Sequence, residues 1–245
     1  MKAMILAAGL GTRLRPLTES KPKALVEICG RPILEIIIRQ LIKYGFRDVI
    51  INTHHHYDQI IDFLKTKNNF GINIRISDEK EQVLDTGGGI KNASWFLDGD
   101  EPFLVHNVDV LSDIDLKGIY DYHVQRHPLV TLAVKGKNSV RSLLIDATCR
   151  LYGWENTDTV ESKIVNGKNR ADLSRIGFCG IHVIDPEIFN YFGENKVFSI
   201  ITTYMEVVGK CAIYGYPVED NLWIDIGSVE QLEYAQNIDP ELYLN

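Results

Sequence analysis

The order of apolar patterns along this chain limits the folds open to it more strongly than any other feature. Four short strand-like runs, at Ala3–Ala7, Asp48–Asn52, Ile72–Ile76 and Pro102–Val105, are separated by segments of helical periodicity. Strands that alternate with helices in this way form a doubly wound, mostly parallel sheet. Ligands of such sheets bind beyond the carboxyl ends of the strands. The sequence therefore predicts an α/β fold with its site at that edge.

Three segments in the first half carry helical patterns. Pro32–Tyr44 has apolar residues at helical spacing, a proline near its start and Gly45 just past its end, so both ends have chemical signals. A second helix is predicted over Tyr57–Lys67. A third is predicted over Gly89–Phe96, beginning directly after a triple glycine.

After Pro128 the pattern changes to shorter strand-like pieces, which predict an added, partly antiparallel portion of the sheet rather than an independent domain. The pieces are Leu129–Val134, Leu143–Ile145, Arg150–Gly153 and Phe178–Ile184. Lys163–Asp172 is predicted to be an exposed loop, and Ser228–Gln236 a last turn and helix. A chain of 245 residues can bury its core in one domain, so residues 1–245 are expected to form a single unit.

The composition argues against several functional classes. The 26 basic and 33 acidic residues give a net charge of −7, which disfavours binding along a nucleic acid because that requires many neutralised phosphates. No run of about 18 apolar residues is available to span a bilayer, and the first apolar stretch is shorter than the core of an export signal. The four cysteines are far apart, without a CxxC pair, and are expected to stay reduced in the cytoplasm.

The first predicted strand runs into a glycine-containing loop, Leu6-Ala7-Ala8-Gly9-Leu10-Gly11-Thr12-Arg13. Small residues at the carboxyl end of a strand let backbone N–H groups approach and bind phosphate oxygens. The hydroxyl of Thr12 adds a donor, and Arg13 with the later Lys23 adds positive charge. The loop lacks the third glycine of the dinucleotide fingerprint, and the chain has no Gly-Lys-Ser/Thr triplet of a P-loop. It therefore indicates a phosphate site of another kind.

Three further segments place polar residues or glycines at the ends of predicted elements. Asp109 follows the apolar run Phe103–Val105, and Asp225 follows Leu222-Trp223-Ile224 ahead of a helix. An aspartate at such a position is often a helix cap, but a phosphate-binding sheet favours a role at the site. The three glycines Gly87–Gly89 lack side chains where a flat ring or a phosphate could approach the third helix.

The motif Leu-Ala-Ala-Gly-x-Gly-Thr-Arg-Leu-x-Pro-Leu-Thr, followed by Pro22-Lys23, resembles the signature of sugar-1-phosphate nucleotidyltransferases, the nucleotide-sugar pyrophosphorylases. In layout the chain is most similar to short bacterial members that act on N-acetylmuramate, mannose or heptose 1-phosphate. The resemblance implies a Rossmann-like, GT-A-like fold with a nucleotide-binding half at about residues 1–127 and a smaller antiparallel sugar-phosphate half at about residues 128–245. It also implies transfer of a nucleoside monophosphate, with UTP favoured, to a sugar 1-phosphate. Pyrophosphate is released, and the NDP-sugar serves cell-wall or surface-polysaccharide synthesis.

Positions that match the family's motif take its roles by resemblance. Arg13 and Lys23 would grip the triphosphate and are the expected catalytic residues. Asp109 and Asp225 would together hold Mg²⁺, which prefers one or two carboxylates plus phosphate and water oxygens. The other expected contacts are, for the nucleotide, Leu6, Ala7, Ala8, Gly9, Gly11, Thr12, Gln82, Thr86, Gly87 and Gly88, and, for the sugar phosphate, Asn107 and Gly180.

One segment departs from the family's pattern. Many longer relatives have a Glu-Lys-Pro segment whose lysine contacts the sugar phosphate, whereas the corresponding stretch here reads Gly153-Trp154-Glu155-Asn156-Thr157. Either another cation such as Arg141 or Lys163 takes the place of that lysine, or the acceptor phosphate binds through the metal ion alone. The sequence leaves both arrangements open.

Other functions remain as alternatives. A guanylyltransferase for mannose or heptose 1-phosphate, a cytidylyltransferase for phosphocholine, and a non-catalytic nucleotide-sugar sensor share the signature or the fold. A sensor is expected to have lost Lys23 or a carboxylate, and this chain keeps them. Metal-dependent glycosyltransferases usually carry Asp-x-Asp, where this chain has Asn107-Val108-Asp109.

Two conspicuous features are assigned to structure rather than to chemistry. His54-His55-His56 cannot easily converge on one metal ion, because consecutive residues of an extended segment point to opposite faces. Cys179 is expected to pack in the interior rather than to act as a nucleophile. The oligomeric state is open.

Overall fold

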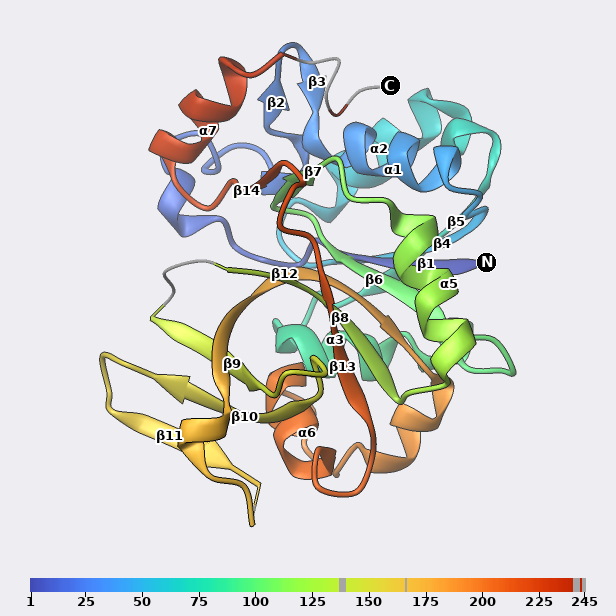
Figure 1. The fold of residues 1–245 in the computed structure, drawn as a ribbon. Helices are drawn as coiled ribbons and strands as arrows, with labels where there is room; N and C mark the ends of the chain where they lie inside the picture. Colours follow the sequence, from blue (N-terminus) through green and yellow to red (C-terminus); the bar gives the residue numbers. More distant parts are fainter. Residues whose placement is uncertain (137–139, 166, 240–242, 244–245) are drawn as a thin grey trace.

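One mixed sheet runs through the computed structural model, which describes residues 1–136, 140–165, 167–239 and 243 (Figure 1). Its ten strands are β1 Lys2–Leu6, β4 Asp48–Thr53, β5 Asn73–Asp78, β6 Phe103–Asn107, β8 Val130–Lys135, β9 Arg141–Ile145, β10 Leu151–Asn156, β11 Glu161–Ile164, β12 Ser174–Ile184 and β13 Ile213–Pro217. They lie in the order β11-β10-β9-β12-β6-β1-β4-β5, with β8 paired to β12 and β13 paired to β8. The small pairs are β2 Glu27–Ile28 with β3 Arg31–Pro32 and β7 Val110–Ser112 with β14 Trp223–Asp225.

The strands β6, β1, β4 and β5 are parallel, as their alternation with helices predicts. Leu6 of β1 lies between Asn52 of β4 and Asn107 of β6 in the register of the sheet. The carboxyl ends of three neighbouring strands therefore meet at one edge. Beyond β6 the sheet continues through β12, which is antiparallel to β6 and carries the later strands. The antiparallel second portion predicted from the sequence is thus part of the same sheet.

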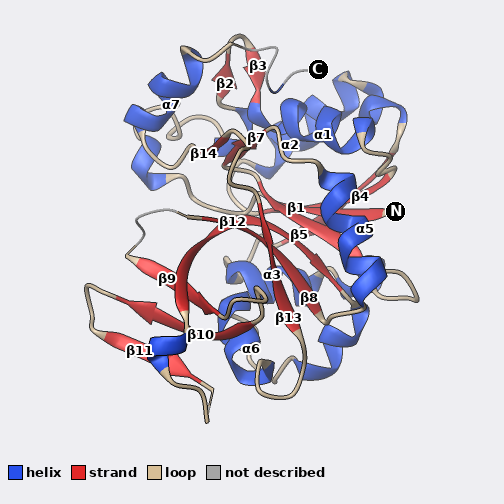
Figure 2. Cartoon of the chain, viewed as in Figure 1, coloured by secondary structure: helices blue, strands red, loops and turns tan. Residues whose placement is uncertain are grey.

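Helices cover both faces of the sheet, with α1 and α2 on one side and α3 and α6 on the other (Figure 2). The helices are α1 Ile33–Lys43, α2 Tyr57–Thr66, α3 Asp85–Asn92, α4 Ser94–Leu97, α5 Leu116–Arg126, α6 Ile200–Val207 and α7 Val229–Gln236. Short 3-10 turns are η1 Thr12–Leu14, η2 Lys23–Leu25, η3 Asn68–Gly71, η4 Arg170–Asp172 and η5 Pro186–Tyr191. The helices α5 and α6 are additions to what the sequence pattern predicts.

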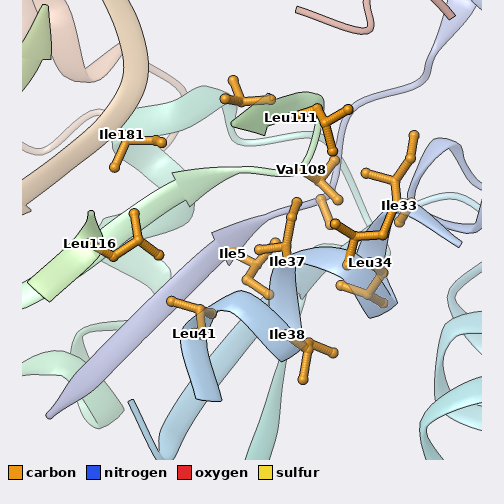
Figure 3. Packing of buried hydrophobic residues seen from close by; sticks show 14 of the residues in the cluster. Ile5, Ile33, Leu34, Ile37, Ile38, Leu41, Val108, Leu111, Leu116 and Ile181 are labelled. Carbon is orange, nitrogen blue, oxygen red and sulfur yellow. The ribbon is translucent and has the colours of Figure 1, made fainter. Parts of the chain in front are cut away.

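Each face of the sheet has its own apolar core, because successive strand residues point to opposite faces. Ile5 packs with Ile37 of α1 in one cluster, as Figure 3 shows, while its neighbour Met4 packs with Ile200 of α6 in the other. Fully burying one such side chain stabilises the fold by about 1.5–3 kcal/mol. None of the helices in the described part of the chain is long and apolar enough to cross a membrane.

The third helix differs from its prediction. It begins at Asp85, so that Gly87–Gly89 lie inside α3 instead of before it, and a break at Ala93 separates α4. The reason is a close approach by another segment: a Cβ atom at Gly87 would collide with the side chain of Phe198, and one at Gly88 with the carbonyl of Lys196. Glycines therefore let residues 196–200 pack directly on the helix.

The predicted loop over Lys163–Asp172 is wrong at its start. Lys163 and Ile164 belong to β11 and pair with Trp154 and Gly153 of β10. Of the rest, residue 166 lies outside the described residues, and the stretch ends in the turn η4. The strand escapes a reading of periodicity because β11 is short, with a largely exposed sequence, Glu-Ser-Lys-Ile.

Candidate functional site

A cavity of about 440 Å³ opens at the carboxyl edge of β1, β4 and β6. Residues predicted for the site that line it are Leu6, Ala8, Gly9, Gly11, Thr12, Arg13, Lys23, Thr86, Asn107 and Asp109. The cavity is where a doubly wound sheet binds its ligands. Arg13 and Lys23 are the basic side chains that line it among residues 1–136, 140–165, 167–239 and 243.

The glycine loop after β1 has the shape that its sequence suggests. Gly11 adopts a left-handed conformation with φ of 62°, and its carbonyl accepts hydrogen bonds from Leu14 N–H at 2.9 Å and from the Thr18 hydroxyl at 2.8 Å. A Cβ atom at Gly11 would also lie 3.0 Å from the Thr18 methyl group. Around Gly9 there is open space within 4 Å, on the cavity side of the loop. Close approach of a ligand to the backbone is therefore sterically possible.

Lys23 and Asp109 form an ion pair across the cavity floor. Lys23 begins η2 after Pro22, and its Nζ lies 2.8 Å from Asp109 Oδ2. The lysine side chain is 8% exposed and the aspartate side chain 28% exposed. The pair places one cation and one carboxylate, from segments 86 residues apart, beside the glycine loop.

Asp225 lies next to Asp109 through strand pairing. Asp225 ends β14 and is paired with Val110 of β7, and Ile226 N–H donates to the Asp109 carbonyl at 2.7 Å. A Cβ atom added to Gly227 would lie 2.7 Å from Arg13 Nη2 and 2.8 Å from Asp225 Oδ1. The absence of a side chain at Gly227, which lines the cavity, thus leaves room for the Arg13 guanidinium and the Asp225 carboxylate, although Asp225 itself is not a lining residue. The cap of α7 is Ser228 rather than Asp225.

The two carboxylates fit a magnesium ion. Hard oxygen ligands suit Mg²⁺, which completes its octahedron with water and substrate phosphates instead of an all-protein cage. In the described part of the chain there is no group of three or more His, Cys, Asp or Glu side chains arranged to hold a metal ion. Asp109, which lines the cavity, and Asp225, whose strand pairs beside it, are therefore the two carboxylates that would hold the ion and leave its other positions to a substrate.

Among the lining residues that the sequence did not predict, two are buried and polar. Asn52 lies one residue before the end of β4 and Glu79 directly follows β5, and each is 3% exposed. Burial raises the pKa of the Glu79 carboxyl, although hydrogen bonds from Leu84 N–H and Asn52 oppose this effect. The only sequence signal for Asn52 is a polar residue at the end of an apolar strand, which is also the signal at Asn107.

Several predicted nucleotide contacts have structural partners instead. Gly87 N–H and Gly88 N–H both donate to the Phe198 carbonyl, at 2.9 and 3.2 Å, and the Thr86 hydroxyl accepts from the backbone of α6. The amide groups that a phosphate would use at the start of α3 are therefore already bonded. Gln82 and Gly88 line a neighbouring cavity of about 710 Å³.

Ala7, a predicted nucleotide contact, is not a lining residue of the cavity, and its N–H donates to Asn52 Oδ1 at 2.6 Å. Of the three consecutive histidines, His54 Nδ1 lies 2.7 Å from the Glu79 carbonyl and His56 Nε2 lies 3.2 Å from the Glu19 carbonyl, while the His55 ring packs against that of His56 at 3.9 Å between centroids.

The residues predicted for the sugar phosphate lie together where β6 meets β12. Gly180 has φ of 74°, and a Cβ atom there would lie 2.8 Å from Asn107 Nδ2. Glycine thus lets β12 approach the cavity wall at Asn107. Cys179 is fully buried, and its carbonyl accepts from Trp223 Nε1 at 2.8 Å.

The segment that the resemblance aligns with the family's Glu-Lys-Pro carries a partly exposed charge cluster around Glu155. Arg170 Nε and Arg175 Nε each lie 2.9 Å from a carboxylate oxygen of Glu155. Lys163 lines a different cavity, of about 240 Å³, and Arg141 begins β9. Neither Arg141 nor Lys163 lines the cavity of about 440 Å³ at the ends of β1, β4 and β6. The structure therefore does not bring a substitute cation from either position to that cavity.

Comparison with known proteins gives consistent matches along the chain. Residues 2–142 match the model of the family described as Nucleotidyl transferase. The N-acetylmuramate alpha-1-phosphate uridylyltransferase of Neisseria meningitidis is 33% identical over 96% of this chain and 97% of its own length. The enzyme of the same name from Caulobacter vibrioides is 30% identical over 92% and 91%. Mannose-1-phosphate guanyltransferase 2 of Candida glabrata is 32% identical over 93% of this chain and 61% of its own length.

Solved structures share the fold. HddC from Yersinia pseudotuberculosis, complexed with GMP-PN, has a TM-score of 0.76 at 24% identity and covers 96% of this chain and 97% of its own. A putative glucose-1-phosphate thymidylyltransferase from Bacillus anthracis has a TM-score of 0.81 at 17% identity, over 98% and 96% of the two chains.

Proposed function

From the premise that this chain belongs to the nucleotidyl transferase family and is a sugar-1-phosphate nucleotidyltransferase, we propose that it uses UTP and an amino-sugar 1-phosphate. The main structural support for placing the reaction at this cavity is that Arg13, Lys23 and Asp109 all line it, with Asp225 close to Arg13. Enzymes of this kind form a nucleotide-activated sugar. We propose that the protein acts in the cytoplasm and that the activated sugar is used for cell-wall or surface-polysaccharide synthesis.

The preference for UTP rests on the relatives that match nearly the whole chain. Both N-acetylmuramate alpha-1-phosphate uridylyltransferases cover more than nine-tenths of this chain and are matched over more than nine-tenths of their own length. The guanyltransferase of Candida glabrata, at 32% identity, lies between these two relatives, but the match covers only 61% of its length. GTP with a mannose-type acceptor is therefore the second candidate.

The chain's own residues supply positioning and charge. In the proposed reaction an oxygen of the sugar phosphate attacks the α-phosphorus of the nucleotide in line with the leaving pyrophosphate. Lys23 and Arg13, which both line the cavity, neutralise charge that develops on the phosphates. A protein nucleophile is not required, because the attacking oxygen belongs to the substrate, and we propose no covalent intermediate.

Asp109 and Asp225 are the residues that would hold Mg²⁺. When bound, the ion would polarise the phosphate oxygens and offset the charge of the leaving pyrophosphate. Asp109→Asn and Asp225→Asn are expected to lower metal-dependent turnover by about 10²-fold or more while circular dichroism and the thermal midpoint change little. Activity equal to the wild type in either variant would remove that residue from the metal site.

The substrate assignment is tested with a matrix of four nucleoside triphosphates against several sugar 1-phosphates and phosphocholine, read as pyrophosphate release. We expect UTP with an N-acetylated amino-sugar 1-phosphate to give the highest kcat/KM. A maximum with GTP and mannose 1-phosphate would support the second candidate. A maximum with CTP and phosphocholine, or nucleotide-sugar binding without pyrophosphate release, would replace the proposal by one of the other two alternatives.

A further inference from the structure

Two buried polar side chains connect the loops on either side of the cavity. Ala7 N–H donates to Asn52 Oδ1 at 2.6 Å, and Asn52 Nδ2 donates to Glu79 Oε1 at 2.7 Å. Leu84 N–H then donates to Glu79 Oε2 at 2.9 Å. A continuous chain of hydrogen bonds therefore runs from the glycine loop after β1 to the segment that precedes α3.

The helix α3 rests on the same two side chains. A Cβ atom at Gly89 would lie 2.8 Å from Asn52 Nδ2 and 2.9 Å from Glu79 Oε1, which is closer than real Cβ atoms come. Both side chains line the cavity of about 440 Å³ that also contains Arg13 and Lys23, although each residue is only 3% exposed. The Asn52–Glu79 pair thus touches three structural parts: the glycine loop, the 79–84 segment and α3.

The order of chemical groups in this chain of hydrogen bonds is constrained. At each end a backbone N–H donates, from Ala7 and from Leu84. The pair must therefore accept one hydrogen bond at each end and form one hydrogen bond between its own two side chains. This requires three acceptors and one donor, which one carboxylate and one amide provide. Two amides would leave a buried donor without an acceptor, and such a group is costly in a low-dielectric interior.

We propose that the Asn52–Glu79 pair is a positioning element for the nucleoside triphosphate. It sets the separation between the glycine loop and the 79–84 segment, and so the width of the cavity that receives the nucleotide. The inference rests on the proposed function for the identity of that ligand. In the sheet, Asn52 and Glu79 belong to the β4–β5 side, whereas the sugar-phosphate residues Asn107 and Gly180 belong to the β6–β12 side. The pair therefore acts on nucleotide affinity and leaves acceptor affinity unchanged.

The test exchanges the two chemical groups. Glu79→Gln and Asn52→Asp each break the match of donors and acceptors. In the double variant the new aspartate accepts from Ala7 N–H and from the amide of the new glutamine, whose oxygen accepts from Leu84 N–H. The hydrogen-bond chain is then complete again with its charge moved by one position. Glu81→Gln is the control, because it removes the same charge from an exposed side chain of the same segment.

Isothermal titration calorimetry with magnesium–UTP, without acceptor, gives the affinity of each protein. Each single variant is expected to raise Kd roughly tenfold or more, the effect of one unsatisfied buried group at about 1.4 kcal/mol. The double variant is expected to return to within about threefold of the wild type, and Glu81→Gln to match it. In steady-state assays of the active proteins, the KM for UTP is expected to follow these affinities while the KM for the sugar 1-phosphate stays within about twofold.

Two results would overturn the proposal: single variants that bind UTP as the wild type does, or a double variant as weak as the singles combined. If a single variant does not fold, recovery of both folding and affinity in the double variant still supports the pair, and a folded double variant with weak binding refutes it. The wild-type titration separates this inference from the proposed function. Binding of GTP instead of UTP refutes only the nucleotide assignment, and the same variants are then compared with GTP. Absence of binding to any nucleoside triphosphate refutes both.

Discussion

Lys23→Met is expected to raise the affinity of the protein for a metal ion alone and to lower kcat/KM for UTP. The ammonium group of Lys23 lies 2.8 Å from Asp109 Oδ2, with the lysine side chain only 8% exposed. It therefore occupies a carboxylate oxygen that a metal ion would need. When a nucleotide binds, its phosphates provide Lys23 with an alternative partner. Without nucleotide, we expect the lysine to compete with the proposed metal ion for Asp109.

The size of the effect follows from Coulomb's law. Two unit charges about 4 Å apart interact with about 4 kcal/mol at an effective dielectric constant of about 20. Asp109 is 28% exposed, so solvent reduces this figure. Even one-third of it corresponds to about a tenfold change in an equilibrium constant. Removing the ammonium is therefore expected to raise the affinity for metal alone by about tenfold or more, and to lower kcat/KM for UTP by about 10²-fold.

Metal binding to the nucleotide-free protein is measured with Mn²⁺ by electron paramagnetic resonance, and nucleotide use by pyrophosphate release. Lys21→Met, two residues away and not a lining residue of the cavity, is the matched control. Unchanged or weaker Mn²⁺ binding in Lys23→Met would refute the competition at Asp109. An unchanged kcat/KM for UTP would refute the phosphate contact.

Three further predictions concern packing and pH. Gly88→Ala pushes a methyl group against the segment that covers α3 and is expected to lower the free energy of unfolding by about 1–3 kcal/mol in urea titrations. Gly9→Ala, with open space around it, is the control and is expected to leave that free energy unchanged. Equal stabilities of the two variants would contradict this packing. Gly180→Ala, at φ of 74° beside Asn107, is expected to raise the KM for the sugar 1-phosphate more than that for UTP, and equal changes would count against the acceptor site. Burial lowers the pKa of His182 from 6.5 to about 3, so the unfolded chain binds a proton that the folded protein excludes. The free energy of unfolding is then expected to fall as pH drops from about 6.5 toward 3, by up to about 1.4 kcal/mol per pH unit for this group, and less steeply in His182→Gln.

The sequence predicts the parts of the fold that are encoded locally. Apolar runs identify β1, β4 and β6 because a strand buried on both faces is apolar throughout, whereas β5, at the edge of the sheet and largely unburied, is marked by the alternation of Ile74 and Ile76 with polar residues. The helix α1 has its own start and end signals. The ends of these strands also indicate where Arg13, Lys23 and Asp109 meet, since parallel carboxyl ends share an edge. Asp225 arrives there through the pairing of β14 with β7, which periodicity alone does not reveal.

The remaining features depend on contacts between distant segments. Three glycines before a helix have the same local pattern whether a ligand or another part of the chain approaches them, and in this protein residues 196–200 approach Gly87 and Gly88. The Asn52–Glu79 pair depends on β4 lying beside β5 in a particular register. A single Asn and a single Glu, 27 residues apart, carry no sign of that contact in the sequence.

The most direct test of the account is the ³¹P NMR spectrum of a reaction containing the protein, Mg²⁺, UTP and N-acetylmuramate 1-phosphate. The account predicts that the β-phosphate signal of UTP disappears while free pyrophosphate and a UDP-sugar diester appear in equal amounts. Orthophosphate and UMP stay absent when pyrophosphatase is excluded. Release of orthophosphate, or UMP and pyrophosphate without the UDP-sugar, would contradict nucleotidyl transfer to this sugar phosphate at the cavity.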